Sequence, residues 1–146
     1  MGARLREPPR HPVVRRRRGR LPAPDARVQR PDEEERPLKG EQEFFAAATV
    51  EWADAGDGIS ERVLSRGPDG MLTRIARWAP GTTSGAEVIR HEYVEEVYLL
   101  EGELTDLTLQ RTFRPGDYAC RPPGMPHGPY TTGTGCVMLE IRYSAG

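Results

Sequence analysis

Residues 121–130 read RPPGMPHGPY, the most constrained stretch of this 146-residue chain. Four prolines and two glycines surround a single histidine, His127. Proline fixes the backbone angle φ and has no N–H group, so the stretch can form neither the interior of a helix nor a central strand. We therefore expect a rigid turn that holds His127. Histidine is also the side chain of this stretch that can bind a metal or move a proton near neutral pH.

A second histidine and a carboxylate are the candidate partners of His127. Residues 90–104 read RHEYVEEVYLLEGEL, in which Glu95 follows His91 by four positions. Alternate residues of a strand face the same side, so Glu95 shares a face with apolar residues, and His91 joins it if the strand extends back through Tyr93. A carboxylate among apolar side chains must be paired or must hold a cation. The pattern predicts an interior site that contains His91 and Glu95.

The chain from residue 44 onward is typical of β-structure. Short runs of alternating or β-branched residues are separated by turn residues, including Gly67-Pro68-Asp69-Gly70 inside an expected hairpin. The expected strands lie within residues 58–67, 71–81, 87–93, 95–104, 105–113, 118–124 and 135–144. Residues 43–53, EFFAAATVEWA, fit either a helical turn or a strand. About seven or eight short strands without a long helix predict an all-β sandwich or barrel.

The N-terminal part of the chain has a different composition. Residues 1–40 carry 12 Lys/Arg and 6 Asp/Glu, a net charge of +6, whereas residues 41–146 carry 9 and 16, a net charge of −7. The same segment holds 7 of the 14 prolines, and the first aromatic residue is Phe44. Such a segment cannot bury enough surface to offset its ordering entropy. We expect residues 1–42 to be a disordered tail and residues 43–146 to be one domain.

Several function classes are excluded at this point. The basic run Arg15–Arg18 lacks the interleaved aromatic residues of single-strand nucleic-acid binders, and no apolar stretch follows it as in an export signal. No segment approaches the roughly 18 apolar residues of a membrane span. Cys120 and Cys136 are too few for a disulfide framework or a zinc cluster. We expect a cytoplasmic protein without a nucleic-acid or membrane partner. Because Lys39 is the only lysine, Schiff-base chemistry in the domain is excluded as well.

Taken together, these residues resemble the two motifs of the cupins, a superfamily of small β-barrels. The second cupin motif, G-x5-P-x-G-x2-H, is met by Gly116, Pro122, Gly124 and His127. The first, H-x-H-x3-E-x6-G, is met by His91, Glu95 and Gly102, but Ile89 stands in the place of its first histidine. Thr131 stands where many cupins have asparagine. The resemblance covers residues 48–146 and is closest to the branch with the metal-binding domains of some anti-sigma factors and the diketone-cleaving dioxygenases.

The resemblance implies an all-β fold, a single jelly-roll-type cupin β-barrel that carries a disordered N-terminal tail. It also implies that His91, Glu95 and His127 converge on one metal ion inside the barrel. Two histidines and one carboxylate leave coordination positions open, as in the non-haem Fe(II) oxygenases. Iron is therefore the expected metal, although Zn, Mn or Ni would suit the same ligands.

Three functions remain open for such a site. The first is an Fe(II) dioxygenase that acts on a small enolisable carbonyl or diketone-like substrate. The second is a non-redox metal-dependent isomerase or cyclase, in which the metal polarises a carbonyl. The third is a non-catalytic module that binds a metal or small molecule. The alternative to any metal site is that the histidines are ordinary core or surface residues. Cupins commonly pair through sheet edges, so we expect a homodimer.

Further residues are candidates for contact with the substrate. Tyr93 occupies a position that can face inward and offer its oxygen. Arg74 lies on an expected strand and could hold an anionic substrate, although strand arginines most often face solvent, and the same holds for Arg77 and Arg142. Cys120 has the same parity as Pro122, so we expect a small inward-facing side chain near the site. Trp52 and Trp78 are expected in the core or at an interface. The sequence does not identify the substrate.

Overall fold

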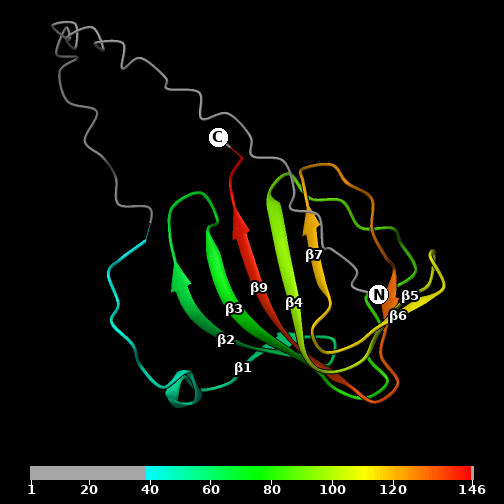
Figure 1. The fold of residues 1–146 in the computed structure, drawn as a ribbon, viewed down its shortest axis with the longest axis horizontal. Helices are drawn as coiled ribbons and strands as arrows, with labels where there is room; N and C mark the ends of the chain where they lie inside the picture. The colour runs from blue at the N-terminus through cyan, green and yellow to red at the C-terminus, as the bar shows by residue number, and fades with distance from the viewer. Residues whose placement is uncertain (1–38, 146) are drawn as a thin grey trace, which may run out of the picture. The chain divides into compact units, whose positions relative to one another are not determined.

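The structure of the protein, a computed structural model, describes residues 39–145 (Figure 1). Most of the predicted disordered tail, residues 1–38, therefore lies outside the described residues. Residues 39–42, the last part of the predicted tail, contact the domain. The Lys39 ammonium donates a hydrogen bond of 2.6 Å to the Thr73 hydroxyl, and the Gln42 amide donates one of 3.1 Å to the Leu64 carbonyl. The boundary between residues 42 and 43 remains a prediction.

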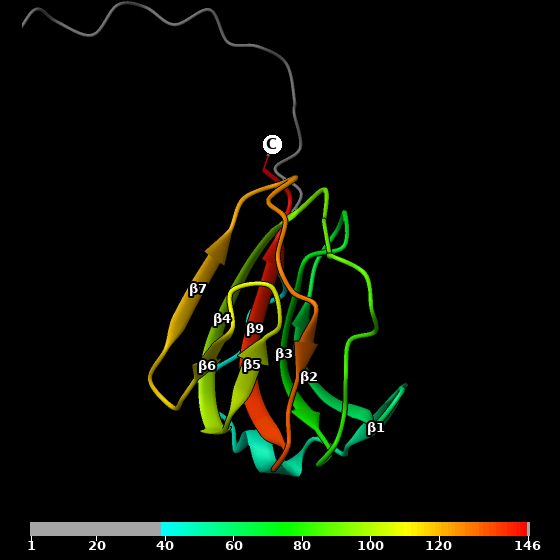
Figure 2. The same cartoon turned by 90° about the vertical axis from the view of Figure 1, so that its right-hand side faces the viewer.

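Within the described residues, nine antiparallel strands form two sheets, which face each other in Figure 2. The larger sheet has the strand order β1-β2-β3-β9-β4-β7, and the smaller has the order β6-β5-β8. Their bounds are β1 (Ala53–Gly56), β2 (Ile59–Arg66), β3 (Leu72–Trp78), β4 (Val94–Gly102), β5 (Leu104–Asp106), β6 (Arg111–Phe113), β7 (Tyr118–Arg121), β8 (Tyr130–Thr131) and β9 (Cys136–Tyr143). The predicted all-β, jelly-roll-type fold is confirmed. Among the described residues the two sheets do not close into a continuous hydrogen-bonded cylinder, so the barrel is open.

The segment with two sequence interpretations, residues 43–53, forms a helical turn. It contains the short 3-10 helix η1 (Ala47–Thr49), and β1 begins at its end. Within residues 39–145, no helix has the length and the apolar character required to cross a membrane.

The predicted hairpin at residues 67–70 is confirmed and joins β2 to β3. The Gly67 N–H donates to the Met71 carbonyl at 3.0 Å, and the Met71 N–H donates to the Pro68 carbonyl at 3.1 Å. Asp69 and Gly70 both have positive φ, 55° and 76°, which the short polar side chain and the glycine tolerate. The turn therefore sets the register at the adjoining end of β2 and β3, up to the irregularity between Val63 and Ser65.

Two of the expected strands are wrong in part. Residues 87–93 form no strand, because they face the proline corner (residues 121–130) instead of a sheet strand; only Ile89 makes an isolated bridge, to His127. Prolines cannot donate ladder hydrogen bonds, so this pairing cannot extend. Residues 105–113 divide into parts of β5 and β6. The Asp106 carboxylate accepts the N–H groups of Thr108 and Leu109, both at 2.9 Å, and this turn interrupts the strand.

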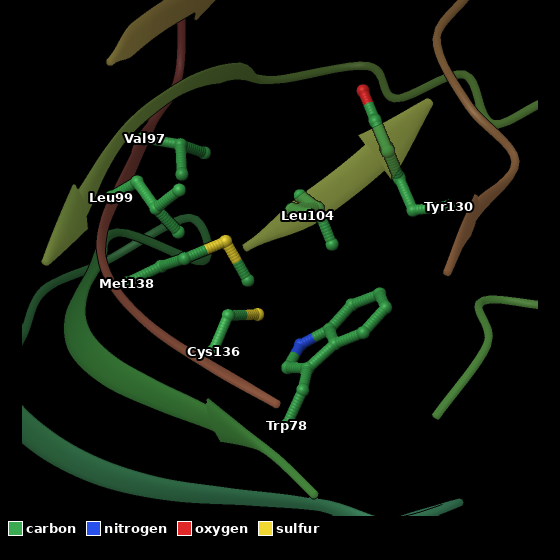
Figure 3. Packing of buried hydrophobic residues seen from close by; sticks show 7 residues of the cluster. All are labelled: Trp78, Val97, Leu99, Leu104, Tyr130, Cys136 and Met138. Carbon is green, nitrogen blue, oxygen red and sulfur yellow. The ribbon is translucent and has the colours of Figure 1, made fainter. Parts of the chain in front are cut away.

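The hydrophobic core lies between the sheets and comes mainly from one face of the larger sheet. Its buried members are Trp78, Val97, Leu99, Leu104, Tyr130, Cys136 and Met138 (Figure 3). On β3, β4 and β9 these residues alternate with less buried ones, as a sheet with one inward face requires. Trp78 is therefore a core residue, as expected. Trp52 instead lies under the guanidinium groups of Arg62 and Arg77, 4.3 and 4.0 Å from its ring centroid.

Candidate metal centre

The proline corner holds His127 by its backbone. The His127 N–H donates to the Ile89 carbonyl at 3.0 Å, and the Ile89 N–H donates to the His127 carbonyl at 2.8 Å. At Gly124 the chain has φ of +80°, and the Gly124 N–H donates to the His91 carbonyl at 2.7 Å. The corner is thus tied directly to the segment that carries the other histidine. The expectation that the corner is a rigid support for His127 agrees with these contacts.

The imidazole of His127 has a defined orientation and protonation. It is 7% exposed, and its Nδ1 lies 3.0 Å from the Met125 carbonyl oxygen. Because a carbonyl can only accept, Nδ1 carries the proton and Nε2 presents a lone pair. Burial lowers the pKa of His127, which favours the neutral ring. A ring oriented in this way through one nitrogen is prepared to bind a metal through the other.

Glu95 lies where the two histidines meet. It is buried on the inward face of β4, as the alternation of residues predicted. Its Oε2 lies 3.2 Å from His91 Nε2 and 3.8 Å from His127 Nε2. One ligand atom from each of the three residues falls within 4.8 Å of the others. The structure therefore brings together the three predicted ligands, although β4 begins at Val94 and His91 precedes the strand.

This arrangement fits a divalent metal. At metal–ligand distances near 2.1 Å, neighbouring ligand atoms of a tetrahedral or octahedral site lie about 3.0 to 3.4 Å apart. The two contacts of Glu95 are close to that range, and the three ligand atoms lie within 4.8 Å of one another, so a bound ion would draw the side chains closer together. Nε2 of His127 also faces a carboxylate oxygen, an arrangement that becomes favourable when a proton or a metal ion lies between them. His91, Glu95 and His127 would hold such an ion.

Two arginines share the carboxylate of Glu95. Arg121 Nη1 donates a hydrogen bond of 3.1 Å to Oε2, and Arg142 Nε lies 3.5 Å from Oε1. Although it is buried, Arg142 Nε makes no hydrogen bond within the described part of the chain, so this ion pair is loose. A metal ion would therefore compete with Arg121 for Oε2. The buried glutamate is paired even without a metal, as its burial requires.

The arginine expected as a substrate contact, Arg74, faces the interior but is paired there. Its guanidinium makes two contacts of 2.7 Å, one with Glu61 and one with Glu140. Burial alone would lower the pKa of Arg74, but Glu140 and Glu61 outweigh burial and raise it. Arg142 reaches Glu140 as well, at 3.3 Å, so the ion pairs run from Glu61 to Glu95. Arg74 is part of this network and lies apart from the His91–Glu95–His127 cluster.

The other two candidates for substrate contact differ from each other. Tyr93 stacks on His91 with ring centroids 4.5 Å apart and an interplanar angle of 11°, so it supports the histidine ring. Burial raises the pKa of Tyr93. Cys120 is exposed and pairs with Glu96 on the outer face of β7, so the expected inward orientation is wrong. The prediction placed Cys120 on the same face as Pro122, which lies beyond the end of β7. In the strand itself Arg121 faces inward, so its neighbour Cys120 faces outward.

A cavity of about 420 Å³ opens beside the cluster. Most of its lining is apolar, and His127, Arg121 and Tyr130 are among its polar residues. Arg121 Nη2 donates a hydrogen bond of 2.7 Å to the Tyr130 hydroxyl, and burial raises the pKa of Tyr130. The sequence interpretation did not single out Arg121 or Tyr130. Their positions at the two ends of the proline corner are the signal that could have identified them.

The two departures from the cupin motifs have structural explanations. Ile89, in the place of a ligand histidine, packs its side chain against the hydrophobic core. Thr131 lies on β8 opposite Thr105, and its hydroxyl donates to the Thr82 carbonyl at 3.4 Å. Both residues therefore serve packing and pairing, and the candidate site keeps three protein ligands.

Comparisons with known proteins agree with this fold. A family model described as the ChrR cupin-like domain matches residues 41–143. A search of the curated proteins found no significant match. Among solved structures, an RmlC-like cupin from Shewanella frigidimarina is 21% identical, with a TM-score of 0.60, over 75% of this chain and 96% of that one.

Two further structures are similar in fold. An acetylacetone dioxygenase from Acinetobacter johnsonii is 15% identical, with a TM-score of 0.58, over 70% of this chain and 74% of that one. The structure of Rhodobacter sphaeroides SigE in complex with the anti-sigma ChrR matches at 18% identity and a TM-score of 0.50, over 66% of this chain and 50% of that one. These identities support the fold alone, whereas the family model spans most of the chain. The chain therefore belongs to the ChrR cupin-like family.

Proposed function

We propose that this protein is a mononuclear metal enzyme that binds one divalent ion through His91, Glu95 and His127. The observation that carries the proposal is the meeting of these three ligands, within 4.8 Å of one another, beside a cavity of about 420 Å³. A cavity of this size can hold a small substrate and is within the range of ordinary ligand pockets. The buried setting would exclude water from the reacting atoms.

Within this proposal, the preferred reaction is that of an Fe(II) dioxygenase on a small enolisable carbonyl or diketone-like substrate. Two histidines and one carboxylate suit Fe(II), and a bound Fe(II) ion would supply Lewis-acid polarisation and redox chemistry with O2. The chain itself supplies the apolar cavity walls and the fixed ring of His127. The fold likeness to an acetylacetone dioxygenase supports this choice as an analogy.

Oxygen consumption tests the proposed reaction. Protein loaded with Fe(II) is expected to consume O2 with at least one compound of a panel of β-diketones and hydroxy-ketones, whereas Zn(II)-loaded protein is not. Glu95→Gln keeps the side-chain shape and is expected to abolish the activity, and Glu92→Gln, at an exposed position, is the matched control. Metal uptake without O2 consumption would reject the dioxygenase and favour isomerase or cyclase chemistry at the same metal.

A second candidate function follows from the family. The ChrR structure is a complex of an anti-sigma factor with SigE, so a metal-binding module that acts through a protein partner is the alternative. In that case the metal would bind, and neither O2 consumption nor isomerisation would be found.

The working state of the protein is also a proposal. We propose a homodimer in the cytoplasm, acting on a small-molecule substrate. The larger sheet ends at β1 and β7, and open sheet edges favour pairing with another chain. Both cysteines are free, which suits a reducing compartment. Light scattering would give twice the chain mass for the dimer and the chain mass for a monomer.

A further inference from the structure

The interior of the domain has a charged part and an apolar part, and the metal cluster adjoins both. Ion pairs connect Glu61, Arg74, Glu140, Arg142 and Glu95 in series. The cavity, in contrast, is lined mainly by apolar side chains, including Val97, Leu99, Leu104, Phe113 and Met138. The wall is mostly hydrocarbon, and its polar side chains are those of Asp106, Thr108, Asp117, Tyr118, Arg121, His127 and Tyr130. The cavity therefore fits a ligand with one polar head and an apolar body.

The residues around the cavity also include exposed apolar side chains. Val88, Leu109 and Met125 line the cavity and are 49%, 59% and 43% exposed. Large apolar side chains that are exposed together at a cavity commonly mark a binding site. Their position allows an apolar body to extend from the cavity toward the surface. This property also limits the ligand to molecules with substantial apolar surface.

The charges of the interior determine the preferred charge of the head group. In residues 39–145, the buried or half-buried charged side chains on the inward faces and in the cavity wall are three arginines and four carboxylates: Arg74, Arg121, Arg142, Glu61, Glu95, Glu140 and Asp106. Asp117 also lines the cavity, but it is exposed to solvent. The histidines are neutral when they ligate a metal. The formal charge is thus −1 without a metal and +1 with a divalent ion.

Arg121 is the charged group best placed to meet the head of the ligand. It lines the cavity, is 9% exposed and donates hydrogen bonds to Glu95 and to the Tyr130 hydroxyl. A guanidinium has five N–H donors, so it can bind a further acceptor while it keeps these bonds. If Glu95 turned toward a metal, Arg121 would lose part of its counter-charge. An anionic head group beside the metal would replace that charge.

From these observations we propose that the metal-loaded site selects a monoanion with an apolar body, such as a medium-chain carboxylate or an enolate of similar size, and that Arg121 binds its anionic head. This inference rests on the proposed binding of a divalent metal. The inference adds the charge and polarity of the molecule that the cavity binds. The three metal-binding residues do not determine these properties. An uncharged ligand of the same size would leave the interior at +1, and a cation would raise it further.

Calorimetric titration with three probes of equal chain length tests this inference without turnover. Octanoate, octan-1-ol and octylamine are titrated into Zn(II)-loaded and metal-free protein, and the metal content of each sample is measured. Octanoate is expected to bind the Zn(II) form at least about tenfold more tightly than it binds the metal-free form, since an added charge-assisted bond is strong in a buried site. It is also expected to bind more tightly than either other probe.

Arg121 variants separate its role from that of the metal. Arg121→Gln is expected to weaken octanoate binding about tenfold and to weaken octan-1-ol binding much less, because the guanidinium binds a charged head more strongly than a hydroxyl group. Arg121→Lys keeps the charge and is expected to retain the preference for octanoate. This result would show that the effect of Arg121→Gln comes from the lost charge and not from a folding defect. Arg66→Gln, at the exposed end of β2, is the matched control.

The outcomes distinguish this inference from the proposed function. Metal uptake with equal affinity for octanoate and octan-1-ol, or with a preference for octylamine, would overturn the inference and leave the metal site in place. Equal weakening of octanoate and octan-1-ol by Arg121→Gln would also overturn the role of Arg121. No uptake of metal would contradict the proposed function itself, and the metal-dependent preference would fail with it.

Discussion

At the scale of single residues, burial controls the chemistry of the site and the core. Burial lowers the pKa of His127 and so favours its neutral form, and the contact of Nδ1 with the Met125 carbonyl turns Nε2 toward Glu95. In the core the same cause acts on a thiol. Burial raises the pKa of Cys136 from 9 to about 11. The burial of His127 prepares a metal ligand, and the burial of Cys136 makes the stability of the fold depend on pH.

The dependence on pH follows from the direction of the Cys136 shift. Between pH 9 and about 11 the folded chain retains the thiol proton while the unfolded chain loses it. The unfolded state then binds fewer protons, so the contribution of Cys136 to the free energy of unfolding is fully present below pH 9 and is lost as the pH rises to about 11. The loss should be about 2 kcal/mol, measured by urea denaturation across this range.

A Cys136→Ala variant is the control for this effect. It is expected to be less stable at neutral pH because it leaves a cavity, but its stability should decline less steeply above pH 9. Tyr130, whose pKa burial also raises, is present in both proteins and contributes equally to both slopes. Identical slopes for the two proteins would show that Cys136 does not account for the pH dependence.

At the scale of elements, short turns set the position of the ligands. Gly102 ends β4, the strand that carries Glu95, and has φ of +75°. An added Cβ at this position would lie 2.0 Å from the Gly135 carbonyl oxygen, so backbone would have to move. Gly70 in the β2–β3 turn has a similar φ of +76°, with no atom within 4 Å of an added Cβ. A comparison of the two positions therefore distinguishes the cost of positive φ, which both share, from the cost of a steric clash, which only Gly102 has.

Alanine substitutions at these two glycines give a direct comparison. Both variants incur the cost of positive φ, and only Gly102→Ala adds the clash with Gly135. Gly102→Ala is therefore expected to lower the free energy of unfolding by about 2 kcal/mol more than Gly70→Ala does. Urea denaturation of the two variants measures the difference. Equal losses would mean that the close approach of Gly102 to Gly135 does not restrain the fold.

The elements also explain what the sequence could and could not predict. The alternation along residues 95–99 is local, and it correctly placed Glu95 and its apolar neighbours on one inward face. The inward face of β7 depends on its pairing with β4, in which Glu95 lies opposite Arg121 and Glu96 opposite Cys120. Such pairing is a long-range contact that local pattern does not contain, so Cys120 was placed wrongly.

The candidate ligands were predictable for a different reason. The spacing of residues within two short motifs identified His91, Glu95 and His127 as candidate ligands, and the structure brings their ligand atoms together. The same motifs did not contain the counter-charges. Arg142 comes from β9, far along the chain, and meets Glu95 only through the strand order of the larger sheet. The ion pairs that balance the interior therefore required the structure.

At the scale of the whole domain, the candidate ion would connect parts of the chain that pair weakly on their own. His91 precedes β4, and His127 lies between β7 and β8. The described backbone contacts between the two segments are the Ile89–His127 pair and the bond from the Gly124 N–H to the His91 carbonyl. A ligand that binds only the native state stabilises it by about 2.7 kcal/mol at a concentration one hundred times its dissociation constant. Metal binding should therefore raise the unfolding temperature of the wild-type protein.

The metal content of the purified protein tests the central claim most directly. Elemental analysis is made on the wild-type protein, on His127→Ala and on Glu92→Gln, after incubation with Fe(II) without oxygen, with circular dichroism to verify that each is folded. The predicted result is about one metal ion per chain in the wild type and in Glu92→Gln, and its loss in folded His127→Ala. A wild-type protein that holds no metal, or a His127→Ala variant that holds as much as the wild type, would contradict the assignment of this site.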